Sequence, residues 1–151
     1  MKRNPLWLLG PVLAVALIAA GCGGGGGDDS TSTSNLAKPA WIAKADAICQ
    51  QGNQEIEQAA NEQFGKQAQK PTDQQIQQFT TETAVPSVQR QIDQIRDLGA
   101  PSGDEDQVNE ILDTVQADID KAKSATTLPD DPFADGNALA TQYGLKVCGQ
   151  S

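Results

Sequence analysis

Three cysteines carry the most distinctive chemistry in this chain: Cys22, Cys49 and Cys148. A thiol can become a thioether, join a disulfide or bind a metal ion. The chain contains no histidine, and no two cysteines have the Cys-x-x-Cys spacing of zinc and dithiol redox sites. We therefore expect neither metal binding nor redox catalysis from these thiols. The sequence around each cysteine must indicate its role instead.

Cys22 follows an apolar run, residues 5–20, that comes after the basic pair Lys2 and Arg3. A basic start, an apolar core and small residues before a cleavage point are the parts of a secretory signal peptide. A retained membrane span is the first alternative, but the run is shorter than the roughly 20 residues that cross a bilayer, and no charged flank follows it. A cleaved signal without lipid is the second alternative.

The residues Ala19-Ala20-Gly21-Cys22 resemble the lipobox of bacterial lipoproteins. The resemblance implies that residues 1–21 are a signal peptide, that Cys22 becomes the mature N-terminus, and that a lipid such as palmitate is attached to it. We therefore expect the chain on the extracytoplasmic face of the cell membrane, held there through Cys22.

The same location bears on the other two cysteines. Once Cys22 is a thioether, Cys49 and Cys148 form an even pair in an exported chain, and such a pair indicates one disulfide. A bridge that closes a loop of about 100 residues stabilises a fold by up to about 4 to 5 kcal/mol in the loop-entropy model.

Carboxylates are the remaining candidates for catalysis, because histidine is absent and no serine stands in a nucleophile motif. We expect them on solvated helix faces, where they do no chemistry: Asp104, Glu105, Asp106, Asp113, Asp118 and Asp120. Asp46 is expected to be structural, either paired with Lys44 or accepting from the C-terminal backbone. No catalytic residue is assigned, and the chain is not expected to be an enzyme. A carboxylate-based hydrolase, the alternative, would need two acidic groups facing each other in a cleft.

Three further patterns are compared with binding sites. The segment 131–137 has Asp, Asp and Gly at calcium-loop positions, but Phe133 and Gln142 stand where oxygen ligands are required, so we expect capping and no metal or other cofactor. Trp41 and Tyr143 are expected in the core rather than at a sugar platform. The glutamines are expected on exposed helix faces, namely Gln50, Gln51, Gln74, Gln75, Gln77, Gln78, Gln89, Gln91 and Gln94.

The charge of the chain restricts its partners. Eleven basic residues face 20 acidic ones, for a net charge of −9, and removal of Lys2 and Arg3 with the signal makes the mature chain more negative. Such a surface repels nucleic acid and anionic lipid head groups. The expected partners are the membrane, through the lipid on Cys22, and an envelope protein or small ligand.

The organisation of the chain follows from composition. Residues 22–38 are rich in Gly, Ser and Thr and predict a flexible linker with a reach of about 20 to 24 Å. Residues 39–151 predict one helical domain. Its first helix starts at Pro39 and ends near Gly65, and its second runs from the N-cap Thr72 to Gly99 with a kink before Pro86.

Two further helices complete the pattern. Ser102 is the expected N-cap of the third, which has Lys121 and Lys123 near its end, and a short fourth helix runs from Pro132 to a glycine cap at Gly144. The prediction is an all-α fold, an antiparallel bundle of three long helices and one short C-terminal helix, closed by one disulfide.

Two short elements carry a family resemblance. The segment Lys44-Ala45-Asp46-Ala47-Ile48-Cys49 and the ending Tyr143-Gly144-Leu145-Lys146-Val147-Cys148-Gly149 resemble elements of small helical lipoproteins of actinobacterial type. The resemblance implies a helical, disulfide-closed, lipid-anchored domain and brings no activity with it. The leading hypothesis is a non-catalytic binding or scaffolding module of the cell envelope. The alternative is a lipoprotein that binds a small molecule between its helices.

Overall fold

A computed structural model describes residues 33–66 and 69–150 of the chain. The predicted signal peptide, Cys22 and the linker up to residue 32 lie outside this part. The all-α prediction is confirmed. The helices are α1 (Lys38–Phe64), α2 (Asp73–Phe79), α3 (Val85–Asp97), α4 (Glu105–Ser124) and α5 (Ala134–Tyr143), with a π-helical segment η1 (Thr80–Ala84) and a 3₁₀ turn η2 (Cys148–Gln150).

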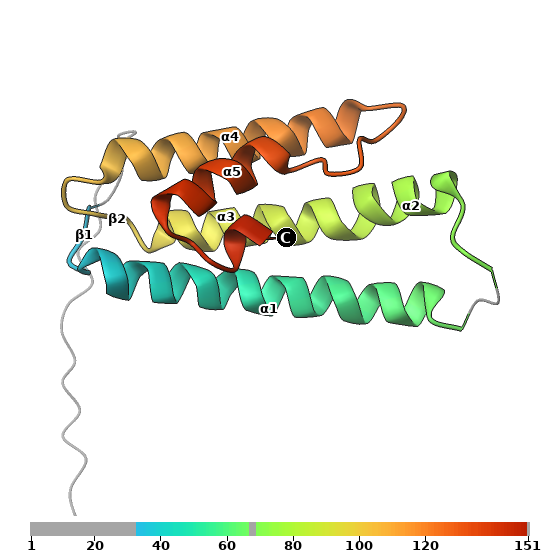
Figure 1. The fold of residues 1–151 in the computed structure, drawn as a ribbon, viewed down its shortest axis with the longest axis horizontal. Coiled ribbons are helices and arrows are strands. Elements are labelled where there is room, and N and C mark those ends of the chain that lie inside the picture. The colour runs from blue at the N-terminus through green and yellow to red at the C-terminus, as the bar shows by residue number, and fades with distance from the viewer. Residues whose placement is uncertain (1–32, 67–68, 151) are drawn as a thin grey trace, which may run out of the picture.

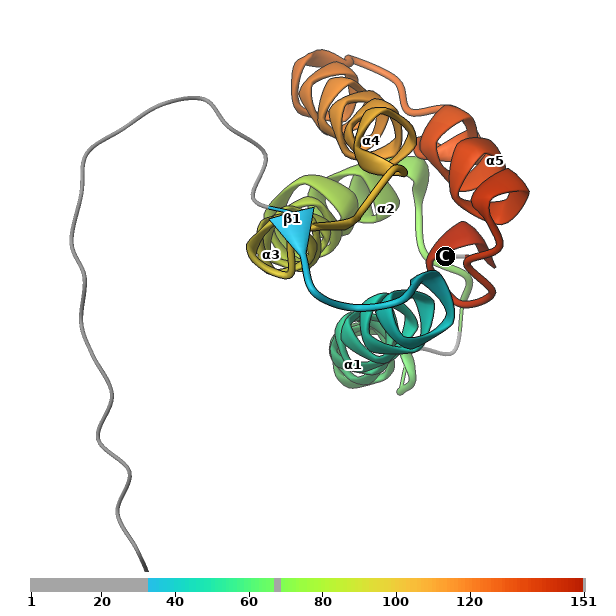
Figure 2. The same ribbon diagram turned by 90° about the vertical axis from the view of Figure 1, so that its left-hand side faces the viewer.

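The helices run up and down as an antiparallel bundle. Figure 1 shows α1 beside the long rod formed by α2, η1 and α3, with α4 returning on the other side and α5 lying in front. Seen along the bundle in Figure 2, α1, α3, α4 and α5 surround a common centre. The short α5 packs against α4, and η2 folds back between α5 and α1.

Local sequence explains where several helices begin and end. Thr72 forms a capping box with Gln75, in which the Gln75 N–H donates to Thr72 Oγ1 (3.3 Å) and the Thr72 N–H donates to Gln75 Oε1 (2.9 Å). Gly144 ends α5 with φ +111°, a left-handed conformation that favours glycine. Both caps were expected from the sequence and are confirmed.

The expected cap of the third helix is wrong. Ser102 lies in a turn, and α4 begins after Asp104, whose side chain makes no capping bond. Instead the N–H of Gly103, which has φ +88°, donates to Glu105 Oε2 (2.7 Å). The left-handed glycine lengthens the turn, so the helix starts two residues later than the serine suggested.

Pro86 distorts its helix as expected. A proline lacks the N–H that would bond four residues back, and its ring crowds that carbonyl. The chain widens to a π-helix over Thr80–Ala84, where the N–H of Val85 bonds to Thr80 O, and α3 then starts with Pro86 in its first turn. The predicted kink is therefore present as a π segment at the expected place.

The N-terminal boundary differs from the prediction. The strand β1 (Thr33–Ser34) pairs in parallel with β2 (Ala100–Pro101), although residues 33–37 were assigned to the flexible linker. Leu36 also packs against the core. Ordered contacts therefore begin six residues before the expected start at residue 39, and they place the incoming chain at the α3–α4 turn (Figure 2).

Burial is concentrated at the β1 end of the bundle. The buried residues of α1 are Trp41, Ala45, Cys49 and Gly52, so none lies beyond Gly52, and α2 has no buried residue. Figure 1 shows the reason: α1 and α2 extend beyond the region that α5 covers. The core therefore lies where α5 packs against the other helices. The end of α1 and the start of α2 extend beyond α5 and are not covered by it.

Candidate functional site

The predicted disulfide joins Cys49 on α1 to Cys148 on η2, with the two Cα atoms 5.2 Å apart. Asp46, one turn before Cys49, accepts hydrogen bonds from three backbone N–H groups, those of Lys146 and Val147 at 3.0 and 2.9 Å and that of Cys148 at 3.3 Å. The disulfide and the structural role of Asp46 are both confirmed, and together they fasten the C-terminal residues to α1.

Trp41 and Tyr143 lie in the core, as expected, with their rings edge to face and 5.6 Å apart. The indole Nε1–H of Trp41 donates to Gly99 O (2.6 Å), and the Tyr143 hydroxyl donates to Asp104 Oδ2 (2.8 Å). Lys38 Nζ lies 3.5 Å from the same Asp104 oxygen and 3.7 Å from the Tyr143 ring centre. Asp104 therefore links α1, α4 and α5 and is not the freely solvated carboxylate that was expected.

Burial and the Asp104 carboxylate raise the pKa of Tyr143 well above its ordinary value of 10. We predict that the free energy of unfolding falls as the pH rises above about 10, because the unfolded chain then loses a proton that the folded chain keeps. Tyr143 is the only tyrosine, so phenolate absorbance reports it alone. Asp104→Asn should lower the pH midpoint of the Tyr143 titration. The control Asp106→Asn, at an exposed residue nearby, should leave that midpoint unchanged. A midpoint near 10 in the folded protein would contradict the prediction.

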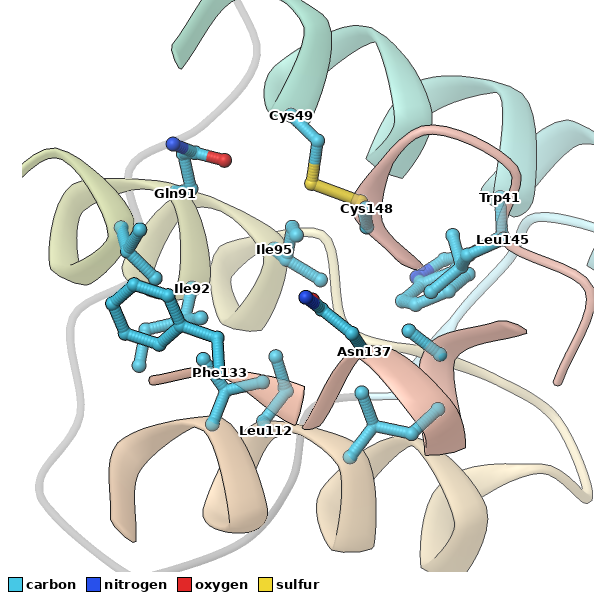
Figure 3. A pocket seen from close by; sticks show the side chains of 14 residues that line it. Trp41, Cys49, Gln91, Ile92, Ile95, Leu112, Phe133, Asn137, Leu145 and Cys148 are labelled. Atoms are coloured by element: carbon cyan, nitrogen blue, oxygen red, sulfur yellow. A yellow bond between two sulfur atoms is a disulfide. The ribbon is translucent and has the colours of Figure 1, made fainter. Parts of the chain in front are cut away.

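An apolar cavity of about 40 Å³ lies between the helices. Figure 3 shows its lining: Trp41 and Leu145 on the right, Phe133 on the left, Leu112 below, the Cys49–Cys148 bridge above, the amide of Gln91 at the upper left and that of Asn137 near the middle. This volume is far below the roughly 300 Å³ of a typical small-molecule pocket. The interior is therefore close to filled.

Asp118 contradicts the expectation of a solvated carboxylate. Its side chain is buried, with a residue exposure of 2%, where it accepts from the Gly136 N–H (3.0 Å) and from Lys121 Nζ (3.0 Å). Hydrogen bonds to Asp118 and then to Asp135 raise the pKa of Lys121. Gly136 makes the approach feasible, because a Cβ there would overlap Val115 of α4. Asp118 thus joins α4 to the start of α5, and Lys121 Nζ lies between its carboxylate and that of Asp135.

Two surface depressions are larger than the cavity, and several of the polar groups that border them pair with one another. One of about 320 Å³ is bordered by Asp118, Lys121 and Asp135, which pair with one another. The other, of about 270 Å³, is bordered by Lys38 and Tyr143, which are engaged as described above. Gln107, Glu110 and Gln142 also border the second depression.

The acidic segment before α5 forms a local turn, and the side-chain cap that was expected for the helix is not formed, although Asp135 stands in its first turn. Asp131 Oδ1 accepts from the Phe133 N–H (2.9 Å), and Asp135 Oδ2 lies 3.4 Å from Lys121 Nζ. Within residues 33–66 and 69–150, no group of three or more His, Cys, Asp or Glu side chains is placed to hold a metal ion.

Most of the glutamines expected on the surface are exposed or half-buried, but Gln91 is not. Gln91 is 6% exposed, and it packs against Gly52 of α1. Ser87, one turn earlier on α3, is also buried. Helical periodicity did not distinguish Gln91 from the other glutamines. The sequence signal was Gly52, because a glycine in the middle of a helix often marks a place where another part of the chain packs closely.

The distal face, which we define as Phe64, Ile76 and Phe79, lies where α1 and α2 extend past α5. Phe64 and Phe79 are half-buried and stack edge to face at 5.4 Å. Ile76, one turn before Phe79, is 47% exposed and is the one exposed large apolar side chain in the described part of the chain.

No helix within the described ranges is both long enough and apolar enough to cross a bilayer. Comparison with protein-family models, with curated proteins and with solved structures found no match.

Proposed function

We propose that this chain is a lipoprotein held on the extracytoplasmic face of the cell membrane by a lipid on Cys22, and that its helical domain is a non-catalytic module that binds another protein of the cell envelope. The basic, apolar and small-residue pattern before Cys22 supports the anchor. The two elements that resemble actinobacterial lipoproteins contain the bridged Cys49 and Cys148 and the Asp46 carboxylate between α1 and the C-terminus.

The arrangement of the domain is consistent with such a role. The chain enters the bundle at β1, beside the start of α1, and the distal face lies near the other end of α1. A helix of 27 residues is about 40 Å long. An anchor on Cys22 would hold the β1 end near the membrane and present the distal face farther out.

One observation carries the proposal: the apolar side chains of the distal face are not used to build the core. No residue of α2 and none of α1 beyond Gly52 is buried, while the interior cavity measures only about 40 Å³. A filled core beside an exposed apolar patch favours a protein partner over a solute held between the helices.

The proposal predicts two linked effects of Cys22→Ser in the native host. The wild-type chain should have an intact mass that begins at residue 22 and includes acyl chains, and it should sediment with membranes. Without the thiol no thioether forms, so the variant should lose the acyl mass and appear in the soluble fraction. Native material that begins at Met1 or carries no acyl mass would contradict the anchor.

The binding role is tested with a photo-cross-linking amino acid at position 76, with position 50 on the exposed face of α1 as the matched control. We expect one discrete protein adduct from position 76, none from position 50, and loss of the adduct when Phe79→Asp is added. The Cys22→Ser chain should give less of the same adduct. The same adducts from both positions would show that the distal face has no specific partner.

A further inference from the structure

The apolar residues between Cys49 and Val85 do not belong to the core. Neither the buried apolar cluster nor the half-buried side chains packed against it include a residue from the described positions 50–66 and 69–84. These positions form the rest of α1 after the disulfide, the whole of α2 and the π segment η1, at the end of the bundle that α5 does not reach (Figure 1). A region with few buried apolar contacts can open while the rest of a protein stays folded.

The contacts that hold α2 against the other helices are individually weak. Gln77 Nε2 donates to Ala125 O at the end of α4 (3.0 Å). The ring of Phe79 stacks edge to face against that of Phe64 on α1, and both side chains are only half-buried. A neutral hydrogen bond and an aromatic pair each contribute little beside the stability of a whole domain. A small free energy therefore keeps α2 closed.

The π segment η1 is suited to be the hinge. Pro86 has no N–H, which interrupts the helical hydrogen bonds at this place, and the N–H of Val85 bonds to Thr80 O, five residues back. The Thr81 hydroxyl donates to Gln77 O (3.0 Å), a contact that often bends helices. Kinks concentrate at prolines and π segments. The helix α3 follows directly and has buried residues from its start, so motion at η1 moves α2 and leaves α3 in place.

Opening would uncover aromatic surface that the closed form hides. In the closed form Ile76 is the one exposed large apolar side chain of the described residues, and the rings of Phe64 and Phe79 cover each other. One side chain is a small anchor, because the binding energy of protein interfaces is concentrated in clusters of large, mainly aromatic, groups. Separation of the two rings would add two such groups to the distal face.

We propose that α2 swings away from α1 about η1 while the disulfide-closed core stays folded, and that this opening regulates the distal face by exposing Phe64 and Phe79. The regulatory part rests on the proposed partner-binding role, whereas the opening itself needs no partner. A partner that binds the opened form shifts the equilibrium between the closed and open forms toward it.

Native-state amide hydrogen exchange tests the opening, on the chain from residue 22 onward with Cys22→Ser and its disulfide intact. A detached helix of seven residues is not stable in water, so the Thr80 N–H, which bonds to the last turn of α2, exchanges when α2 opens. The Ile119 N–H lies in the buried part of α4 and reports the core. Low concentrations of urea should accelerate exchange at Ile119 but not at Thr80, because a local opening exposes little surface.

Removing the disulfide gives a second measurement of the same difference. The bridge joins residues 99 positions apart and stabilises the core against global unfolding. Replacing both bridged cysteines by alanine should therefore speed exchange at Ile119 by about a thousandfold or more. Exchange at Thr80 should change by less than about twofold, because the bridge is present in both the closed and the open form of the unmodified chain.

The variant Gln77→Glu tests whether the contact to α4 keeps α2 closed. A carboxylate of nearly the same size cannot donate to Ala125 O, so exchange at Thr80 should become roughly two- to tenfold faster, with Ile119 unchanged. The matched control is Gln74→Glu, at an exposed residue of the same helix, which should speed exchange at neither position. Because a partner would bind the opened form, Gln77→Glu should also increase the yield of the adduct from position 76.

The outcomes separate the opening from the partner-binding role. Equal urea dependence of exchange at Thr80 and Ile119, or no protection at all at Thr80, would overturn the opening. Faster exchange in Gln77→Glu without more adduct would overturn its regulatory part. Absence of any adduct from the wild-type chain would contradict the proposed function and the regulatory part with it, whereas the opening would stand on the exchange data alone.

Discussion

Replacing Cys49 and Cys148 together by alanine is expected to lower the free energy of unfolding by about 4 to 5 kcal/mol and to leave the folded structure in place. The two residues are 99 positions apart, and the bridge removes the entropy of so long a loop from the unfolded chain. The double variant avoids the buried free thiol that a single substitution would leave behind.

The fold should persist because other contacts hold the C-terminal residues. Asp46 accepts from the N–H groups of Lys146 and Val147, and Leu145 is buried in the core. The Thr141 hydroxyl also donates to Gly149 O (3.2 Å). These contacts do not involve the sulfur atoms, so we expect them to persist without the bridge and the loss of stability to arise mainly in the unfolded state.

Chemical denaturation followed by circular dichroism measures the effect. The wild-type chain under reducing conditions should lose a similar amount, and Asp46→Asn in the bridged chain serves as the control for loss of the tail contacts alone. A decrease below about 1 kcal/mol in the double variant would show that the unfolded chain is already compact or that the bridge strains the folded state.

The helical bundle could be predicted from the sequence because its signals are local. Apolar spacing, the Thr72 cap, the glycine at position 144 and the proline at position 86 each act within a turn or two of the residues they affect. The disulfide was predictable for a different reason, since only two cysteines follow Cys22.

The errors concern residues whose surroundings come from elsewhere in the chain. Asp118 and Gln91 have the side chains of solvated helix faces, yet Asp118 is buried against Gly136 and Gln91 against Gly52. In both places a glycine lets the opposing helices approach closely: a Cβ at Gly52 would overlap the Gln91 amide, and a Cβ at Gly136 would overlap Val115, one turn from Asp118. Helical periodicity reports one helix at a time, so it does not detect this pairing. The β1–β2 contact was missed because it joins two residue pairs that have no strand pattern.

Trp41→Ala is expected to lower the free energy of unfolding by about 3 to 5 kcal/mol. Trp41 is 1% exposed, stacks against Tyr143, and gives its indole N–H to Gly99 O at the end of α3. Removing it opens a cavity where α1, α5 and the α3–α4 turn meet, and leaves the Gly99 carbonyl without its donor. Trp41→Phe keeps most of the packing but removes the indole N–H, so it measures the effect of the hydrogen bond apart from that of the cavity. For this variant we expect the free energy of unfolding to fall by about 1 to 3 kcal/mol.

Ile76→Ala is the matched control, because it also truncates a large apolar side chain, but on the distal face. With 47% of Ile76 exposed, the change should cost about 0.5 kcal/mol or less when measured in the same denaturation experiment. The contrast connects stability to the proposed role, since the apolar groups near β1 build the core and those on the distal face are free for a partner. If Ile76→Ala instead destabilised the domain as much as Trp41→Ala, the distal face would belong to the folding core, and the observation that supports partner binding would be lost.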